Sequence, residues 1–333
     1  MTSSLHVGVF GAGAIGGYVG ARLAHAGVPV TLVGRGAALA ELRRGVRLSD
    51  HRGFSAEAAG LAVGDAPAAL GGASHVLVAV KSGDTEAAGR ALRGVLGRDA
   101  VVISFQNGVR NAERLRALLP GHLVLAAMVP FNVVRTETRL HQGTSGTLAI
   151  EAHPRAAPLR DALVRAGLPT LLEPEVARRQ WGKLLVNLGN AVNALSGLPI
   201  RAMLADRGHR RVMAALVEEG LSALQRAGIR PVLDMPVPAW VVPRLLRLPD
   251  GLFRFVLPAL AKVDHEARSS MADDLRRGRA TEVDALNGEI VRLAATAGMD
   301  APYNARIVEL VRQAERGAQP RSSAELLHAL GLA

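Results

Sequence analysis

The N-terminal half of the chain alternates between strand-like and helix-like hydrophobic patterns. Short runs of aliphatic residues predict five buried strands, at 5–10, 29–33, 75–80, 100–105 and 122–128. Helical patterns lie between several of them, at 14–26, 36–44, 84–96 and 109–118. Because strand and helix alternate, we expect an α/β fold, in which a parallel sheet carries helices on both faces.

The pattern then changes twice. Residues 129–151 alternate polar and apolar positions around a Gly-rich turn, which predicts antiparallel strands added to the same sheet. A helix near 155–166 and a short strand near 169–172 are expected to complete a first domain, 1–174.

From residue 175 on, the strand signal disappears. The predicted helices lie at 175–197, 205–227, 238–262, 264–276, 281–297 and 303–316. We therefore expect an all-helical second domain, 175–316, and a loosely attached C-terminal tail, 317–333. Within that tail, SSAELLHAL predicts one short helix capped by Ser322 or Ser323.

The amino-acid composition excludes several classes of functional site. None of the 333 residues is cysteine, which excludes disulfides, a thiolate nucleophile and cysteine-bound zinc or iron–sulfur sites. No histidine or acidic cluster has metal-ligand spacing, so no metal is expected. The net charge is +11, yet the arginines are dispersed and aromatic residues are 3% of the chain, which disfavours nucleic acid as a partner. No segment resembles a signal peptide or a membrane span, so we expect a cytoplasmic protein.

Lysine is rare in this chain. Only Lys81, Lys183 and Lys262 occur among 40 basic residues. A compositional bias that replaces lysine by arginine leaves lysine where arginine cannot serve, and only lysine can lose its proton near neutral pH. These three positions are therefore candidates for chemistry.

A glycine-rich segment follows the first predicted strand and opens the first predicted helix. It has the spacing G-x-G-x-x-G and comprises Gly11, Ala12, Gly13, Ala14, Ile15 and Gly16. In this context the first glycine permits a tight turn, the second lets a pyrophosphate approach, and the third lets helix and strand pack closely. The segment predicts a dinucleotide site in a Rossmann-like domain.

The end of the second predicted strand discriminates between cofactors. NAD enzymes usually place an acidic residue there, whereas this chain has Arg35 and no acid before Glu41. A guanidinium can clamp a 2′-phosphate, which favours NADP(H). The alternative is a solvated arginine in an arginine-rich protein.

Two further strands end in polar residues, Lys81 and Asn107. Ligands of open parallel sheets bind beyond the C-terminal ends of the strands, so both residues are expected beside the glycine-rich segment and Arg35. The competing interpretations are a surface lysine and an ordinary Asn-Gly turn.

Two helical segments of the second domain carry polar groups. Lys183, Asn187 and Asn190 fall on one face of an otherwise apolar helix, which suggests a ligand cleft or a polar network, and a lysine of lowered pKa there could donate a proton. Further on, Thr281 and Asp284 could form a capping box, which would leave Glu282 as a first-turn acid.

Together these segments resemble the ketopantoate reductase family. The resemblance covers about residues 5–315 and rests on GAGAIGG with Arg35, VAVKS, FQNGV, WGKLLVNLGN, SSMADDL and RATEVDALNG, in that order. It implies a Rossmann-like domain, a helical domain and an active site between them. It also implies reduction of ketopantoate to pantoate by NADPH, on the route to pantothenate and coenzyme A.

The resemblance also implies residue roles. Lys183 corresponds to the catalytic lysine that polarises the carbonyl and protonates the developing alkoxide. Glu282 corresponds to the acid that hydrogen-bonds the substrate hydroxyl, assists catalysis and lies near the cofactor. Asn107 and Lys81 correspond to residues beside both cofactor and substrate, and Asn187 and Ser270 to substrate contacts. The segment NLGNAVNALSG is two residues longer than the usual pattern, which leaves both Asn190 and Asn193 as candidates for a further substrate asparagine.

Three other functions remain open at this point. They are reduction of a different 2-oxo acid, NADPH sensing without turnover, and arginine-driven binding of nucleic acid. A homodimer is compatible with the sequence, which does not determine the oligomeric state.

Overall fold

The computed structural model describes residues 5–260 and 267–333. These residues form two compact units, Met1–Ala177 and Arg178–Ala333, which divide three residues after the predicted boundary at 174. The predicted helices 238–262 and 264–276 partly lie outside the described residues, as does Lys262.

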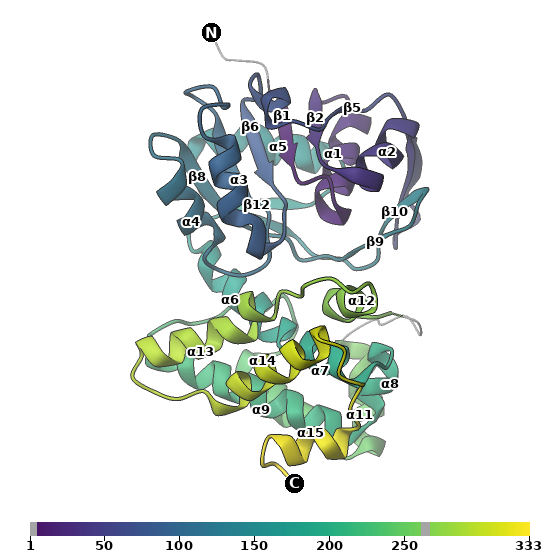
Figure 1. Ribbon diagram of the computed structural model, residues 1–333, viewed down its shortest axis with the longest axis vertical. Helices are drawn as coiled ribbons and strands as arrows, with labels where there is room; N and C mark the ends of the chain where they lie inside the picture. Colours follow the sequence, from purple (N-terminus) through teal and green to yellow (C-terminus); the bar gives the residue numbers. More distant parts are fainter. Residues whose placement is uncertain (1–4, 261–266) are drawn as a thin grey trace. The chain divides into compact units, whose positions relative to one another are not determined.

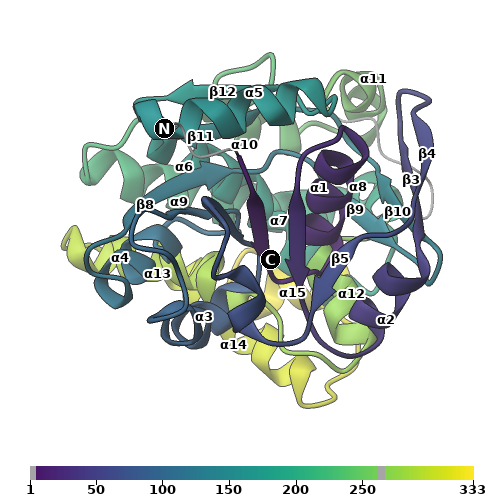
Figure 2. The same ribbon diagram turned by 90° about the horizontal axis from the view of Figure 1, so that it is seen from above.

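The first unit is built on an eight-stranded sheet with the order β12-β11-β8-β7-β6-β1-β2-β5 (Figures 1 and 2). All neighbouring strands are parallel except β11, which runs antiparallel to β8. The strands are β1 (Val7–Phe10), β2 (Val30–Val33), β5 (Ala62–Gly64), β6 (His75–Val78), β7 (Val101–Ser104), β8 (Leu123–Met128), β11 (Leu148–Glu151) and β12 (Thr170–Glu173). The five strands predicted from aliphatic runs are all present, as is the expected α/β fold.

Helices cover both faces of this sheet, because the side chains of each strand alternate between two hydrophobic clusters. One cluster joins the sheet to α1 (Ala14–His25) and α5 (Ala157–Arg165), and the other joins it to α3 (Thr85–Leu92) and α4 (Asn111–Leu118). The remaining helix, α2 (Gly36–Arg44), follows β2. The unit also contains three short 3₁₀ turns: η1 (Pro67–Leu70), η2 (Ser82–Asp84) and η3 (Pro154–Ala156).

A second, four-stranded sheet was not predicted. Its order is β4-β3-β10-β9, with β3 (Val46–Asp50), β4 (Ser55–Ala58), β9 (Val133–Arg135) and β10 (Arg139–Gln142). The prediction that 129–151 would add strands to the main sheet is therefore wrong for β9 and β10, and correct for β11 alone. The polar sequences of β3 and β4, VRLSD and SAEA, lack the aliphatic runs that revealed the other strands.

The second unit is helical, as predicted. Its helices are α6 (Val176–Asn187), α7 (Gly189–Ser196), α8 (Ile200–Ala205), α9 (Arg207–Arg226), α10 (Val242–Leu246), α11 (Asp250–Leu260), α12 (Ser270–Arg276), α13 (Asn287–Thr296), α14 (Pro302–Glu315) and α15 (Ser323–Ala329), with 3₁₀ turns η4 (Ala239–Val241) and η5 (Val283–Ala285). The predicted helix 175–197 is thus divided at Leu188, and 238–262 is divided before Pro249. Among the described helices, none has the length and apolar character needed to cross a bilayer.

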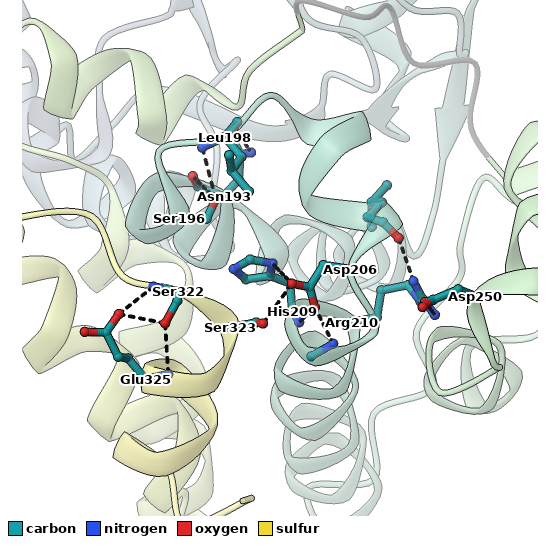
Figure 3. Close-up of polar contacts among 12 residues, drawn as sticks. Asn193, Ser196, Leu198, Asp206, His209, Arg210, Asp250, Ser322, Ser323 and Glu325 are labelled. Atoms are coloured by element: carbon teal, nitrogen blue, oxygen red, sulfur yellow. Dashed lines mark hydrogen bonds and ion pairs between the residues drawn. The ribbon is translucent and has the colours of Figure 1, made fainter.

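The C-terminal segment is part of the second unit, so the expectation of a loose tail is wrong. Ser322 caps α15 in a full capping box with Glu325, and the Ser323 hydroxyl donates to Asp206 at the start of α9, 2.8 Å away (Figure 3). The Arg321 amide donates to the Leu195 carbonyl of α7. Leu326 and Leu327 are buried, so apolar packing and polar contacts together hold the segment.

Candidate active site

The glycine-rich segment forms the turn between β1 and α1. Gly11 has a φ of +108°, and a side chain there would meet the backbone of Ala79, so only glycine fits. A methyl group on Gly16 would collide with the Gly11 carbonyl. At Gly13, by contrast, a methyl group would meet nothing within 4 Å. The fold therefore needs glycine at the first and third positions, and leaves the second open to a ligand.

The chain around Gly13 suits a dinucleotide pyrophosphate. The N-terminus of α1 has no side-chain cap and no acidic residue in its first turn, so its oriented amides can receive an anion. Arg35 is exposed and precedes α2 at the end of β2. These features fit a nicotinamide dinucleotide, with phosphates at the glycine loop and the adenosine end near Arg35.

Strand register places the predicted cofactor residues on one edge of the sheet. Phe10 pairs with Val33 on one side and Val78 on the other, and Val78 pairs with Ser104. The glycine loop, Arg35, Lys81 and Asn107 all follow these four strand ends within a few residues. The structure thus brings the first unit's candidates together at the C-terminal edge of the sheet.

Buried polar groups hold the backbone of Asn107. Its carbonyl accepts hydrogen bonds from the Ser82 hydroxyl, at 2.8 Å, and from the Asn111 side chain. Thr85 donates to Asn111 and receives a bond from Gln106, so the residues after β6 and β7 form one network. This network fixes the loop, and both Lys81 and Asn107 remain partly exposed.

Lys183 lies on α6, where a neighbouring loop is attached to the helix. The Val232 amide donates to the Arg178 carbonyl at 2.9 Å, and Arg179 pairs with Asp234 at 2.8 Å. A methyl group on Gly182 would collide with the Val232 carbonyl. Glycine at 182 therefore permits the close approach of this loop immediately before Lys183.

The electrostatic environment of Lys183 suits a proton donor. The residue is half-buried, and desolvation outweighs the attraction of a neighbouring carboxylate, so its pKa falls from 10.5 to about 8. The Glu282 carboxylate acts in the opposite direction and raises that pKa. Lys183 is therefore mostly protonated at neutral pH and releases its proton more readily than a surface lysine.

Glu282 lies just before η5, and the capping box considered for this segment does not form. The Thr281 hydroxyl accepts from the Val283 amide, while Asp284 pairs with Arg312 at 2.7 Å. The predicted helix 281–297 is divided into η5 and α13, which begins only at Asn287. Glu282 is therefore not a first-turn acid of a long helix, and its carboxylate acts on Lys183 instead.

The three asparagines after Lys183 differ in their surroundings. Asn187 ends α6 and Asn190 lies in the first turn of α7, and both are partly exposed. Asn193 is 1% exposed, and its side chain accepts from the Ser269 amide at 2.9 Å. It also donates to the Leu198 carbonyl at 2.9 Å (Figure 3). The amide of Asn193 thus joins α7 to the start of α12, where Ser270 is exposed.

Arg135 was not identified from the sequence. It extends from β9 to the Ala12 carbonyl in the glycine loop and to Glu41 on α2. The strand that carries it belongs to the unpredicted sheet, and no local motif marks it. The only signal was indirect: Glu41 is the first acidic residue after β2.

These features define a two-unit oxidoreductase that uses a nicotinamide dinucleotide. The profile described as ketopantoate reductase PanE/ApbA matches residues 7–155, and the profile for its C-terminal part matches residues 175–315. The chain belongs to the ketopantoate reductase family.

Curated relatives agree with this assignment. The 2-dehydropantoate 2-reductase of Halobacterium salinarum is 31% identical over 324 residues, which covers 94% of this chain and 99% of the relative. That of Archaeoglobus fulgidus is 31% identical over 321 residues, which covers 93% and 98%.

Solved structures extend the comparison. A ketopantoate reductase of this family from Ralstonia eutropha is 32% identical, with a TM-score of 0.80 over 94% of this chain and 99% of its own. D-mandelate dehydrogenase in complex with NADH and anilino(oxo)acetate has the same fold, with a TM-score of 0.75 over 94% of this chain and 99% of its own at 19% identity.

Proposed function

We propose that this protein reduces ketopantoate to pantoate with NADPH and thereby serves pantothenate and coenzyme A synthesis. The observation that carries the proposal is Lys183, a proton donor whose pKa is lowered by desolvation and kept near 8 with the opposing charge of Glu282, within the family-matched helical unit. The names of the relatives that are about one-third identical support the substrate.

In this proposal, different residues of the chain bind the cofactor and supply the proton. The amides at the α1 N-terminus bind the pyrophosphate, and Arg35 binds the 2′-phosphate. The bound nicotinamide supplies the hydride that the keto carbon receives. Lys183 hydrogen-bonds the keto oxygen and gives it a proton as negative charge develops there, which lowers the barrier because that charge belongs to the transition state.

Other residues position the substrate and the acid. Glu282 maintains the protonated form of Lys183, and in this proposal it also contacts the substrate hydroxyl and the cofactor. Asn107, Lys81, Asn187 and Ser270 contact the substrate, and Asn107 and Lys81 also adjoin the nicotinamide. Asn190 is favoured over Asn193 as the further substrate contact, because both side-chain groups of Asn193 are already bonded to Ser269 and Leu198.

The test is NADPH oxidation by the purified protein with ketopantoate, beside simpler 2-oxo acids, an aryl 2-oxo acid and an NADH control. We expect fast turnover with ketopantoate and NADPH. Turnover confined to another 2-oxo acid would replace the substrate but retain Lys183 and Arg35 in their roles. Tight NADPH binding without turnover on any acid would instead indicate a sensor.

A homodimer is a separate part of the proposal. The ketopantoate reductase of Staphylococcus aureus, 21% identical with a TM-score of 0.72, is described as dimeric. Sedimentation velocity decides the question, since a dimer has twice the 34.9 kDa mass of the chain. Sedimentation as a monomer at micromolar concentration would contradict it.

A further inference from the structure

Arg135 connects three segments that are far apart in sequence. Its guanidinium donates to the Ala12 carbonyl at 2.9 Å, to the Ala38 carbonyl at 2.7 Å, and to Glu41 at 2.9 and 2.7 Å. All of these residues belong to the first unit. One side chain thus joins β9, the glycine loop and α2.

The ion pair is largely withdrawn from solvent. The side chains of Arg135 and Glu41 are 15% and 13% exposed, so the pair is screened less than a surface pair, and either charge alone would be felt by nearby groups. Arg35 immediately precedes α2, and Glu41 lies six residues further on, roughly 9 Å along a helix that rises about 1.5 Å per residue.

Glu41 is also the only acidic residue in α2 and the first after β2. NAD-binding folds of this type place an acid at the end of β2 to accept the ribose hydroxyls. Glu41 lies further on, within α2, and its unpaired carboxylate would repel a 2′-phosphate bound near Arg35. Here that carboxylate is bonded to Arg135 instead.

We propose that Arg135 is a positioning residue that determines cofactor specificity. It neutralises Glu41, so that the positive charge of Arg35 faces the 2′-phosphate without an opposing carboxylate. It also ties the Ala12 carbonyl to α2, which sets the spacing between the pyrophosphate and 2′-phosphate sites. This inference rests on the proposed use of NADPH.

The test measures dissociation constants for NADPH and NADH from nicotinamide fluorescence, together with the melting temperature of the cofactor-free protein. The variants are Arg135→Met, Glu41→Gln and the Arg135→Met/Glu41→Gln double variant. Arg139→Met is the matched control, because Arg139 lies on the adjacent strand β10 and bonds Ser49 and His141 instead.

In Arg135→Met, NADPH affinity is expected to fall about tenfold more than NADH affinity, since an unpaired carboxylate then lies within about one Debye length of the phosphate. The double variant lacks that charge and regains most of the preference for NADPH, although both cofactors bind more weakly because the loop is no longer tethered. Arg139→Met keeps the parental preference.

Equal losses for NADPH and NADH in Arg135→Met would overturn the inference, since a merely structural arginine gives that result. If Arg135→Met does not fold, the double variant, which buries no unpaired charge, is compared with Glu41→Gln. If the double variant then binds NADPH and NADH as tightly as Glu41→Gln does, the proposed tethering of the glycine loop to α2 is overturned. An Arg35→Ala variant distinguishes a failure of this inference from a failure of the proposed use of NADPH. Parental preference for NADH, or an Arg35→Ala variant with unchanged preference, would contradict the proposed cofactor rather than the role of Arg135.

Discussion

The Glu282 carboxylate raises the pKa of Lys183 and desolvation lowers it more strongly, which leaves the pKa at about 8. The two residues come from α6 and from the segment before η5, and both belong to the second unit. This balance keeps the ammonium group charged at neutral pH although it is partly withdrawn from water. A proton donor for a developing alkoxide needs this combination of charge and acidity.

Replacing Lys183 with methionine is expected to lower kcat by about a hundredfold to ten-thousandfold, the usual contribution of a general acid. NADPH binding should persist, because the glycine loop and Arg35 belong to the other unit. Steady-state kinetics and fluorescence titration measure the two effects. Near-parental turnover with bound NADPH would eliminate Lys183 as the acid.

The pH profile provides an independent check. Reduction requires protonated Lys183, so kcat/KM should fall about tenfold per pH unit above a pKa of about 8. Oxidation of pantoate requires the neutral amine, so kcat/KM for that direction should rise with pH instead of falling. A reduction rate that stays level to pH 10 would contradict this assignment.

Glu282→Gln removes the charge that raises the pKa of Lys183, while keeping a side chain of similar size. The descending limb of the reduction profile should therefore move to lower pH. Asp284→Asn is the matched control, because Asp284 lies two residues away and pairs with Arg312. A limb that shifts equally in both variants, or in neither, would show that Glu282 has no specific effect.

The glycine loop predicts opposite outcomes for two substitutions. Gly13→Ala should leave the melting temperature near that of the parent but weaken dinucleotide binding, because the added methyl group enters open space on the ligand side. Gly16→Ala should destabilise the fold by about 1–3 kcal/mol through overpacking against Gly11. Thermal unfolding without cofactor and fluorescence titration distinguish them. Unchanged affinity in a folded Gly13→Ala variant would place the pyrophosphate elsewhere.

Substitution of Asn193 should affect the stability of the fold, whereas substitution of Asn190 should affect substrate binding. Asn193→Ala leaves the buried Ser269 amide and the Leu198 carbonyl without their partner and should cost about 1–3 kcal/mol of stability. Asn190→Ala should instead raise KM for the 2-oxo acid at nearly constant stability. Chemical denaturation and kinetics on both variants test this; the reverse pattern would restore Asn193 as the substrate contact.

Much of the fold follows from local pattern. The aliphatic runs of β1, β2, β6, β7 and β8 and the glycines at 11, 13 and 16 carry their signal within a few residues, because buried parallel strands and a tight strand–helix turn tolerate few alternatives. The motifs around Asn107, Lys183 and Glu282 are equally local, and their order along the chain was enough to indicate the family.

Tertiary structure decided what depends on partners distant in sequence. The polar strands β3 and β4 pair with each other, and β3 also pairs with β10, so their own residues do not reveal them. Asn193 resembles Asn190 in sequence, and only burial against Ser269 distinguishes it. Asp284 pairs with Arg312 rather than completing a capping box.

The ionisable residues of the site also show which properties follow from sequence and which from tertiary structure. The sequence by itself determined which ionisable side chains exist: Lys183 as a rare lysine, Glu282 in a motif, Arg35 after β2, and Glu41 as the first acid beyond it. Their ionic properties depend on solvent exclusion and on neighbours brought in by folding. The desolvation of Lys183, its coupling to Glu282 and the pairing of Glu41 with Arg135 were therefore decided only by the packing of distant segments.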